Sequence, residues 1–109
     1  MGRYVIIESR DPFDSQDVTA MYELAEGLAR EGSSVTLFLV QNGVLPVRQG
    51  CTYAARLAEL AAGKRVAVVA DDFSLRERGI GRLAGGVTTS GIDELVDLMM
   101  SEGTKTIWH

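Results

Sequence analysis

The sequence is poor in the residues that mark several large classes of protein. Its 109 residues include one cysteine, two prolines and one histidine. A lone cysteine excludes an internal disulfide framework. A lone histidine excludes a histidine-rich metal site within one subunit, and its place at residue 109 argues against a triad-type hydrolase. Hydrophobic residues make up 46% of the chain, which is too large a share for an intrinsically disordered protein.

Long apolar stretches and an excess of positive charge are also missing. Aliphatic runs such as Val66–Ala70 are far shorter than the roughly 20 residues that a membrane helix needs. The N-terminus lacks the pattern of a signal peptide, so we expect a cytoplasmic protein without membrane contact. The net charge of −4 does not favour binding to phosphate backbones, so nucleic acid is not an expected partner.

The hydrophobic pattern alternates between the periods of strands and helices. Strands are predicted over residues 3–9, 35–40, 65–70, 87–89 and 104–108. Helices are predicted from a cap at Asp14 or Ser15 to Gly32, over 51–62 and 74–78, and from a cap at Ser90 to Gly103. Residues 43–50 are expected to form a loop or a short helical turn because they contain Pro46 and end in Gly50.

This order predicts an α/β fold over residues 1–109 as a single domain. Strands 35–40 and 65–70 are continuously apolar, which is typical of a parallel sheet that is buried on both faces. We therefore expect a three-layer sandwich with a mostly parallel sheet of about five strands. Such sheets bind their ligands at the carboxyl ends of the strands. The candidate site segments are thus 8–14, 41–51 and 71–74.

Cys51 is the candidate nucleophile. It follows Gly50 at the predicted start of a helix, where the helix dipole favours the thiolate form. Arg48 and Arg56 would add positive charge. A thiolate at this place could carry a persulfide or attack a disulfide. The simpler interpretation is a small apolar residue packed under the sheet.

Asp71 and Asp72 follow the third predicted strand. Paired carboxylates at this place resemble the metal-binding and phospho-accepting arrangement of receiver domains, and Glu8 and Asp11 could complete a Mg²⁺ site. The sequence lacks the acidic pair after the first strand and the Lys-Pro after the last strand that this class carries. The simpler interpretation is that one of the two aspartates caps the next helix.

Two further features are weaker candidates for a site. The stretch 79–84 fits the glycine pattern of dinucleotide-binding proteins, but it follows a helical segment instead of a strand. His109 is the last residue of the sequence, where little structure is available to position an imidazole. We expect His109 to be exposed to solvent or to join Trp108 in a subunit contact.

Several motifs together resemble the DsrE/DsrF-like sulfur-relay family, which has the YchN-like fold. They are the opening strand with its acidic loop, the strand 35–39 that leads into Asn42-Gly43-Val44, the stretch 71–80, and the closing segments 86–87 and 92–95 with the last strand. The resemblance covers nearly the whole chain. It implies a small α/β fold, assembly into trimers or hexamers, and sulfur transfer through a cysteine persulfide.

The sequence departs from this family at the sulfur site. The resemblance places the usual cysteine after the third strand, eight positions before the glycine that matches Gly79, and this position is Asp71. A carboxylate cannot carry sulfane sulfur. The resemblance therefore implies an accessory or binding subunit without the usual sulfur carrier, in contact with a sulfur-relay protein or a small ligand.

Two alternatives stay open. One is a sulfurtransferase that carries persulfide on Cys51, and the other is a receiver-like metal-binding module that uses Asp71 and Asp72. Neither the accessory subunit nor the Cys51 sulfurtransferase is expected to hold a resident metal or cofactor. The candidate binding residues at the sheet edge are Asp11, Asn42, Gly43, Arg48, Asp71, Asp72 and Ser74.

Overall fold

The computed structural model describes residues 2–63 and 66–109. The strands are β1 (Arg3–Glu8), β2 (Ser34–Leu39), β3 (Val66–Asp71), β4 (Thr88–Ser90) and β5 (Thr104–Trp108). The helices are α1 (Asp17–Arg30), the 3₁₀ helix η1 (Gln41–Val47), α2 (Ala54–Ala62), α3 (Asp72–Glu77) and α4 (Ile92–Met100). The predicted order of elements is confirmed, and the short helical turn after the second strand is η1. Arg65, the first residue of the predicted third strand, lies outside the described residues.

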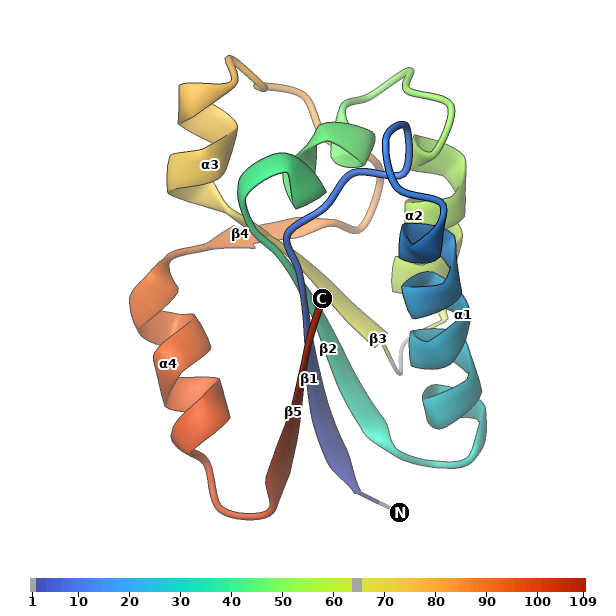
Figure 1. The fold of residues 1–109 in the computed structure, drawn as a ribbon, viewed down its shortest axis with the longest axis vertical. Coiled ribbons are helices and arrows are strands. Elements are labelled where there is room, and N and C mark those ends of the chain that lie inside the picture. Colours follow the sequence, from blue (N-terminus) through green and yellow to red (C-terminus); the bar gives the residue numbers. More distant parts are fainter. Residues whose placement is uncertain (1, 64–65) are drawn as a thin grey trace.

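All five strands form one parallel sheet in the order β4-β3-β2-β1-β5 (Figure 1). The chain adds strands on one side of β1 up to β4 and then crosses the sheet through α4 to place β5 on the other side of β1. The strand order therefore reverses beside β1. The carboxyl ends of β1, β2 and β3 lie at one edge of the sheet, together with η1 and α3.

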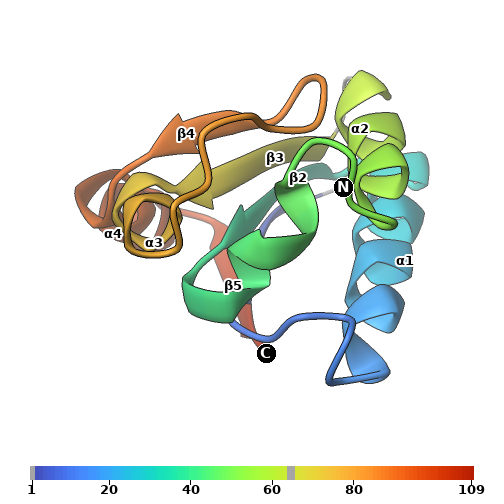
Figure 2. The same ribbon diagram turned by 90° about the horizontal axis from the view of Figure 1, so that it is seen from above.

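Helices cover both faces of the sheet, as predicted for a three-layer α/β sandwich (Figure 2). On one face, α1 and α2 pack on the sheet through residues such as Val18, Tyr22 and Leu57, which are fully buried. On the other face, Leu95 of α4 packs with Val5 and Phe38. None of the helices in the described part of the chain is long and apolar enough to cross a membrane.

The predicted cap of the first helix is wrong, whereas its predicted end is confirmed. Neither Asp14 nor Ser15 caps α1, which begins after Gln16 without a side-chain cap. The side chain of Asp11 instead accepts hydrogen bonds from the main-chain N–H groups of Phe13 and Asp14 at 2.9 and 3.0 Å and forms a turn before the helix. The chain leaves α1 at Gly32, whose φ of 97° is accessible to glycine.

Helix α4 carries an apolar stripe that is exposed over most of its length. Helix α4 follows Gly91 instead of a cap at Ser90, and only Leu95 of the stripe is buried. Ile92 and Val96 are each 49% exposed, and Met99 is 38% exposed. The helix is amphipathic, but no other described part of the chain covers these three side chains fully.

Candidate binding site

Asp71 and Ser74 form the buried centre of the candidate site. Asp71 ends β3 and caps α3, because its Oδ2 accepts hydrogen bonds from the main-chain N–H of Ser74 at 3.0 Å and from the Ser74 hydroxyl at 2.6 Å. Both residues are 3% exposed. The interpretation of one aspartate as a helix cap is thus confirmed for Asp71. The Oδ1 atom of Asp71 is also buried and has no hydrogen-bond partner among the described residues.

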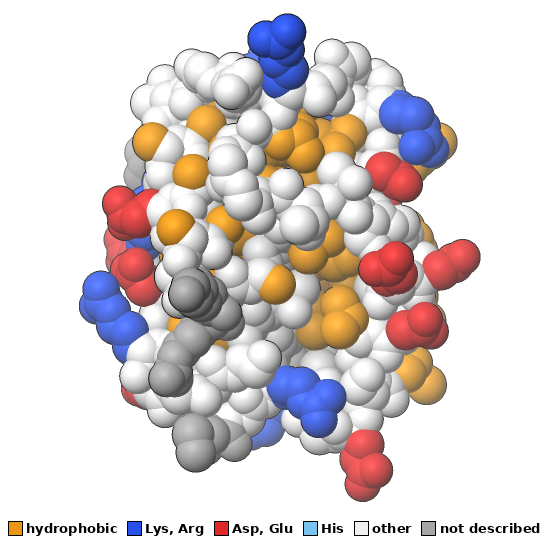
Figure 3. Space-filling view, turned by 180° about the vertical axis from the view of Figure 1, so that it is seen from behind, with side chains coloured by type: hydrophobic (Ala, Val, Ile, Leu, Met, Phe, Trp, Pro, Cys, Tyr) orange, Lys and Arg blue, Asp and Glu red, His pale blue; other side chains and the backbone are white. Residues whose placement is uncertain are grey.

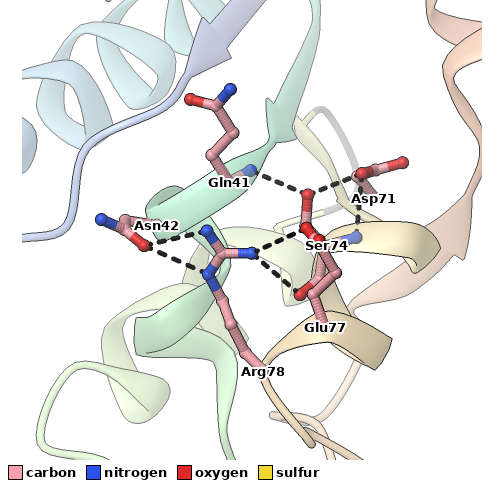
Figure 4. A network of polar contacts seen from close by, with 6 residues as sticks. All are labelled: Gln41, Asn42, Asp71, Ser74, Glu77 and Arg78. Atoms are coloured by element: carbon pink, nitrogen blue, oxygen red, sulfur yellow. Dashed lines mark hydrogen bonds and ion pairs between the residues drawn. The ribbon is translucent and has the colours of Figure 1, made fainter.

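The same pair of residues is tied to η1 by a polar network (Figure 4). The main-chain N–H of Gln41 donates to the Ser74 hydroxyl at 2.8 Å. The guanidinium of Arg78 donates to Asn42 Oδ1 at 3.0 and 3.1 Å and to the carbonyl of Ser74 at 3.2 Å. Arg78 also lies 3.6 Å from a carboxylate oxygen of Glu77. The network fixes α3 against η1 and brings Asn42, Asp71 and Ser74 together.

A hollow of about 280 Å³ opens beside this network, between α3 and α4. Its polar side is formed by Gln41, Asp71, Ser74 and Glu77, and its apolar side by Val40, Phe73, Ile92, Leu95 and Trp108. Phe73 and Trp108 are 56% and 66% exposed. The site thus combines two carboxylates with a partly exposed aromatic and aliphatic wall.

Gly43 has a packing role at the same edge. A Cβ at this residue would lie 2.1 Å from the carbonyl oxygen of Glu8 and 3.0 Å from its carbonyl carbon. The main chain of η1 can therefore approach the end of β1 only because residue 43 has no side chain. The N–H of Val40 donates to the same Glu8 carbonyl at 3.0 Å. Gly43 thus places η1 against β1, and its part in ligand binding stays a prediction.

Glu8 and His109 form a second buried cluster at the carboxyl ends of β1 and β5. Glu8 is fully buried, and its two carboxylate oxygens lie 2.8 and 2.9 Å from Nδ1 of His109. The N–H of His109 donates to the carbonyl of Ile7, and the hydroxyl of Ser9 donates to the main-chain oxygen of His109. The expectation of a poorly positioned imidazole is wrong, because the pairing of β5 with β1 holds it in place.

Cys51 does not stand at a helix start. Helix α2 begins at Ala54, three residues later than the start predicted at Cys51, and Cys51 lies half-buried in the loop before it. Burial raises the pKa of the Tyr22 hydroxyl, and the charged forms of Glu8 and Cys51 raise it further. The role of Cys51 as a nucleophile stays a prediction.

The two arginines expected to support the thiol have other partners. Nε of Arg48 donates to the carbonyl of Leu45 at 3.2 Å. Arg56 donates to Glu26 and to Glu59 at 3.1 Å. The hydrogen bond from Arg56 holds the pKa of Glu26 below its ordinary value. Arg56 thus links α2 to α1 in the structure.

Asp11 and Asp72 lie apart from the buried centre. Asp11 borders a separate hollow of about 420 Å³ with Asn42 and residues 9, 10, 14 and 15. Asp72 is partly exposed and pairs with Arg76 one turn later in α3, at 3.8 Å. Among the residues that the structure describes, no group of three or more His, Cys, Asp or Glu side chains is placed to hold a metal ion.

The sequence interpretation did not identify several residues of the two clusters. Arg78 is not among the binding residues predicted from the sequence, and Gln41 takes part through its main chain. Glu8 was considered only as a metal ligand. The available signal was the place of Glu8 within the first predicted strand, because a carboxylate buried by a strand needs a partner.

The fold and the edge of the sheet together define a class of protein. It is a small α/β protein with a parallel sheet, in which the loops at the carboxyl ends of the strands carry the polar groups. The chain belongs to the DsrE/DsrF-like family, whose model matches residues 2–108. This family is associated with sulfur relay. The predicted family membership is confirmed.

Two solved structures are similar to this chain over the whole length of both proteins. The crystal structure of the YchN protein from E. coli has 22% sequence identity and a TM-score of 0.88. The structure of MTH1491, a protein of unknown function from Methanobacterium thermoautotrophicum, has 23% identity and a TM-score of 0.85. At these identities the likeness concerns the fold. A search among curated proteins finds no match.

Proposed function

We propose that this protein is an accessory or binding member of its family that works as a homo-oligomer and does not itself carry sulfur at the end of β3. The observation that carries the proposal is the buried carboxylate of Asp71 beside the hollow between α3 and α4. The family resemblance places the sulfur-carrying cysteine at this position. A carboxylate there binds a hydrogen-bond donor, and it cannot form a persulfide.

The exposed side of α4 supports assembly. Val96, Met99 and Met100 are 49%, 38% and 80% exposed. Hydrophobic side chains gather on the face shown in Figure 3, with acidic side chains beside them. A large exposed apolar surface on a small protein is typical of a contact between subunits. In keeping with the family resemblance, the proposed assembly is a trimer or a hexamer.

Light scattering on the purified full chain tests this proposal. We expect a mass of three or six copies at micromolar concentration. A strictly monomeric protein would overturn the proposed assembly. The role without sulfur transfer is tested separately by mass spectrometry after incubation with a persulfide donor. We expect no added sulfur, and a stable gain of one sulfur atom would overturn it.

Persulfide transfer through Cys51 is the second candidate function. It is favoured by Cys51, which is the sole cysteine of the sequence and lies half-buried in the loop before α2. In this reaction the Cys51 thiolate takes the outer sulfur of a donor persulfide, and the donor leaves as a thiolate. The mass experiment decides between the two functions, because Cys51→Ser would abolish a gain of sulfur at this residue.

A further inference from the structure

The hollow between α3 and α4 carries one unpaired acceptor on a buried residue. Oδ2 of Asp71 receives both hydrogen bonds from Ser74, whereas Oδ1 is buried without a partner among the described residues. Figure 4 shows Oδ1 turned away from Ser74. A buried carboxylate oxygen is destabilising unless a donor or a positive charge satisfies it. Because Asp71 lines the hollow, a bound molecule can supply that donor.

The charge of the lining favours a cation. Asp71 and Glu77 both border the hollow, and its described lining contains no basic side chain. The nearby arginines have their own partners, since Arg78 binds Asn42 and the Ser74 carbonyl and Arg76 lies 3.8 Å from Asp72. Glu77 lies 3.6 Å from Arg78, so a carboxylate or phosphate ligand would be repelled mainly by the unpaired charge of Asp71. An ammonium group would instead make a charge-assisted hydrogen bond with Asp71.

The opposite wall favours an apolar body on the ligand. Phe73, Ile92 and Trp108 are 56%, 49% and 66% exposed and line the same hollow. Aliphatic carbon buried against these side chains gains from the hydrophobic effect. The aromatic rings also attract a nearby cation. The volume of about 280 Å³ lies just below the usual range of small-molecule pockets, so the fitting ligand is small.

We propose that the hollow at the end of β3 binds a short alkylammonium ion, with its ammonium group on Oδ1 of Asp71 and its carbon chain along Phe73, Ile92 and Trp108. This inference rests on the proposed function, because it names the class of ligand for the same site. It replaces the sulfur chemistry implied for the family at this position with the recognition of an amine.

The sole tryptophan of the chain, Trp108, reports binding directly. The full-length protein is titrated at neutral pH with n-butylammonium chloride while tryptophan fluorescence is recorded. Parallel titrations use n-butanol, which has the same chain without the charge, sodium butyrate, which has the opposite charge, and sodium chloride. We expect a saturable change with n-butylammonium alone. No saturable change with the amine, or the same change with n-butanol or butyrate, overturns the proposal.

Two variants test the role of the carboxylates. Asp71→Asn keeps an oxygen that can accept from Ser74 and removes the charge, so the affinity for n-butylammonium should fall by about tenfold or more. Glu77 is partly exposed, so Glu77→Gln should weaken binding by a smaller factor than Asp71→Asn. It serves as the test if Asp71→Asn does not fold. Glu23→Gln, an exposed residue of α1, removes the same charge elsewhere and should leave the affinity unchanged.

The outcomes separate this inference from the proposed function. Unchanged affinity in both Asp71→Asn and Glu77→Gln overturns the amine site, whatever the assembly is. Light scattering on the same samples gives the number of copies independently of any ligand. A trimer or hexamer that ignores n-butylammonium would keep the proposed function and exclude this ligand class.

Discussion

Ser74 is the residue on which the candidate site depends most directly. Its hydroxyl donates to Asp71 and accepts from the main chain of Gln41, so one oxygen joins β3, α3 and η1. The side chain is 3% exposed. Inside a protein such a hydroxyl fixes its partners in place, and its removal leaves polar groups without partners. The position of the Asp71 carboxylate is therefore set by a second side chain, not by the backbone of β3 alone.

We expect Ser74→Ala to lower the free energy of unfolding by about 1–3 kcal/mol, because the N–H of Gln41 loses its acceptor. Urea denaturation followed by circular dichroism measures this change. Ser101→Ala is the matched control, because the Ser101 hydroxyl donates only to the carbonyl of Asp97 in an exposed place. Its effect should stay within about 0.5 kcal/mol. Equal effects of the two substitutions would contradict the buried role of Ser74.

At the scale of elements, η1 is the part that shapes the edge of the sheet. It is held to β1 through the carbonyl of Glu8, which accepts from Val40. It is held to α3 through Gln41 and Asn42. The contact with β1 requires the close approach of two main chains at Gly43. A short 3₁₀ helix has little stability of its own, so these tertiary contacts decide where η1 lies.

Gly43→Ala should be strongly destabilising, by about 1–3 kcal/mol or more, because the new methyl group would press on the backbone of β1. The thermal midpoint measured by calorimetry should fall accordingly. Gly27→Ala provides the control, since a Cβ at Gly27 of α1 meets no atom within 4 Å. That change should stabilise α1 by about 0.5–1 kcal/mol. Two glycines with the same response would show that the contact at Glu8 is unimportant.

At the scale of the whole molecule, the two faces of the sheet are covered unequally. The fully buried cluster beneath α1 and α2 is extensive, whereas α4 contributes the buried Leu95 and the partly buried Leu98 to a smaller cluster. The outer side of α4 continues into exposed methionines. An assembly that covers this side would bury apolar area that the monomer leaves in water.

Val96→Asp should break the proposed assembly and leave each copy folded. Val96 is 49% exposed in the monomer, so the stability of the monomer should change by about 0.5 kcal/mol or less. A charge placed in the covered surface should shift the mass seen by light scattering toward one copy. Ala55→Asp, on the exposed side of α2, adds the same charge on the other face and should not change the mass. An unaltered oligomer in Val96→Asp would place the subunit contact elsewhere.

The sequence alone determined the order of elements and the fold class. Continuous apolar strands alternating with amphipathic helices are local patterns with their own periods, and they allow few arrangements other than a layered parallel sheet. A cap at Asp71 or Asp72 was predicted for the same reason, because a cap joins residues three positions apart, and the structure shows that Asp71 is the cap. The grouping of Asn42 with Ser74 followed in outline from the rule that carboxyl ends of parallel strands share one edge.

The tertiary structure alone decided which polar groups meet and which apolar surface stays uncovered. The contact of Glu8 with His109 joins residues 101 positions apart. The hydrogen bond from Arg78 to Asn42 joins residues 36 positions apart. Neither contact can be predicted from the periodicity of hydrophobic residues along the chain. The exposure of α4 depends on how much of its surface the sheet can reach, because a helical stripe shows only that a helix has an apolar side. Such a pattern does not say whether the same chain or another copy covers that side.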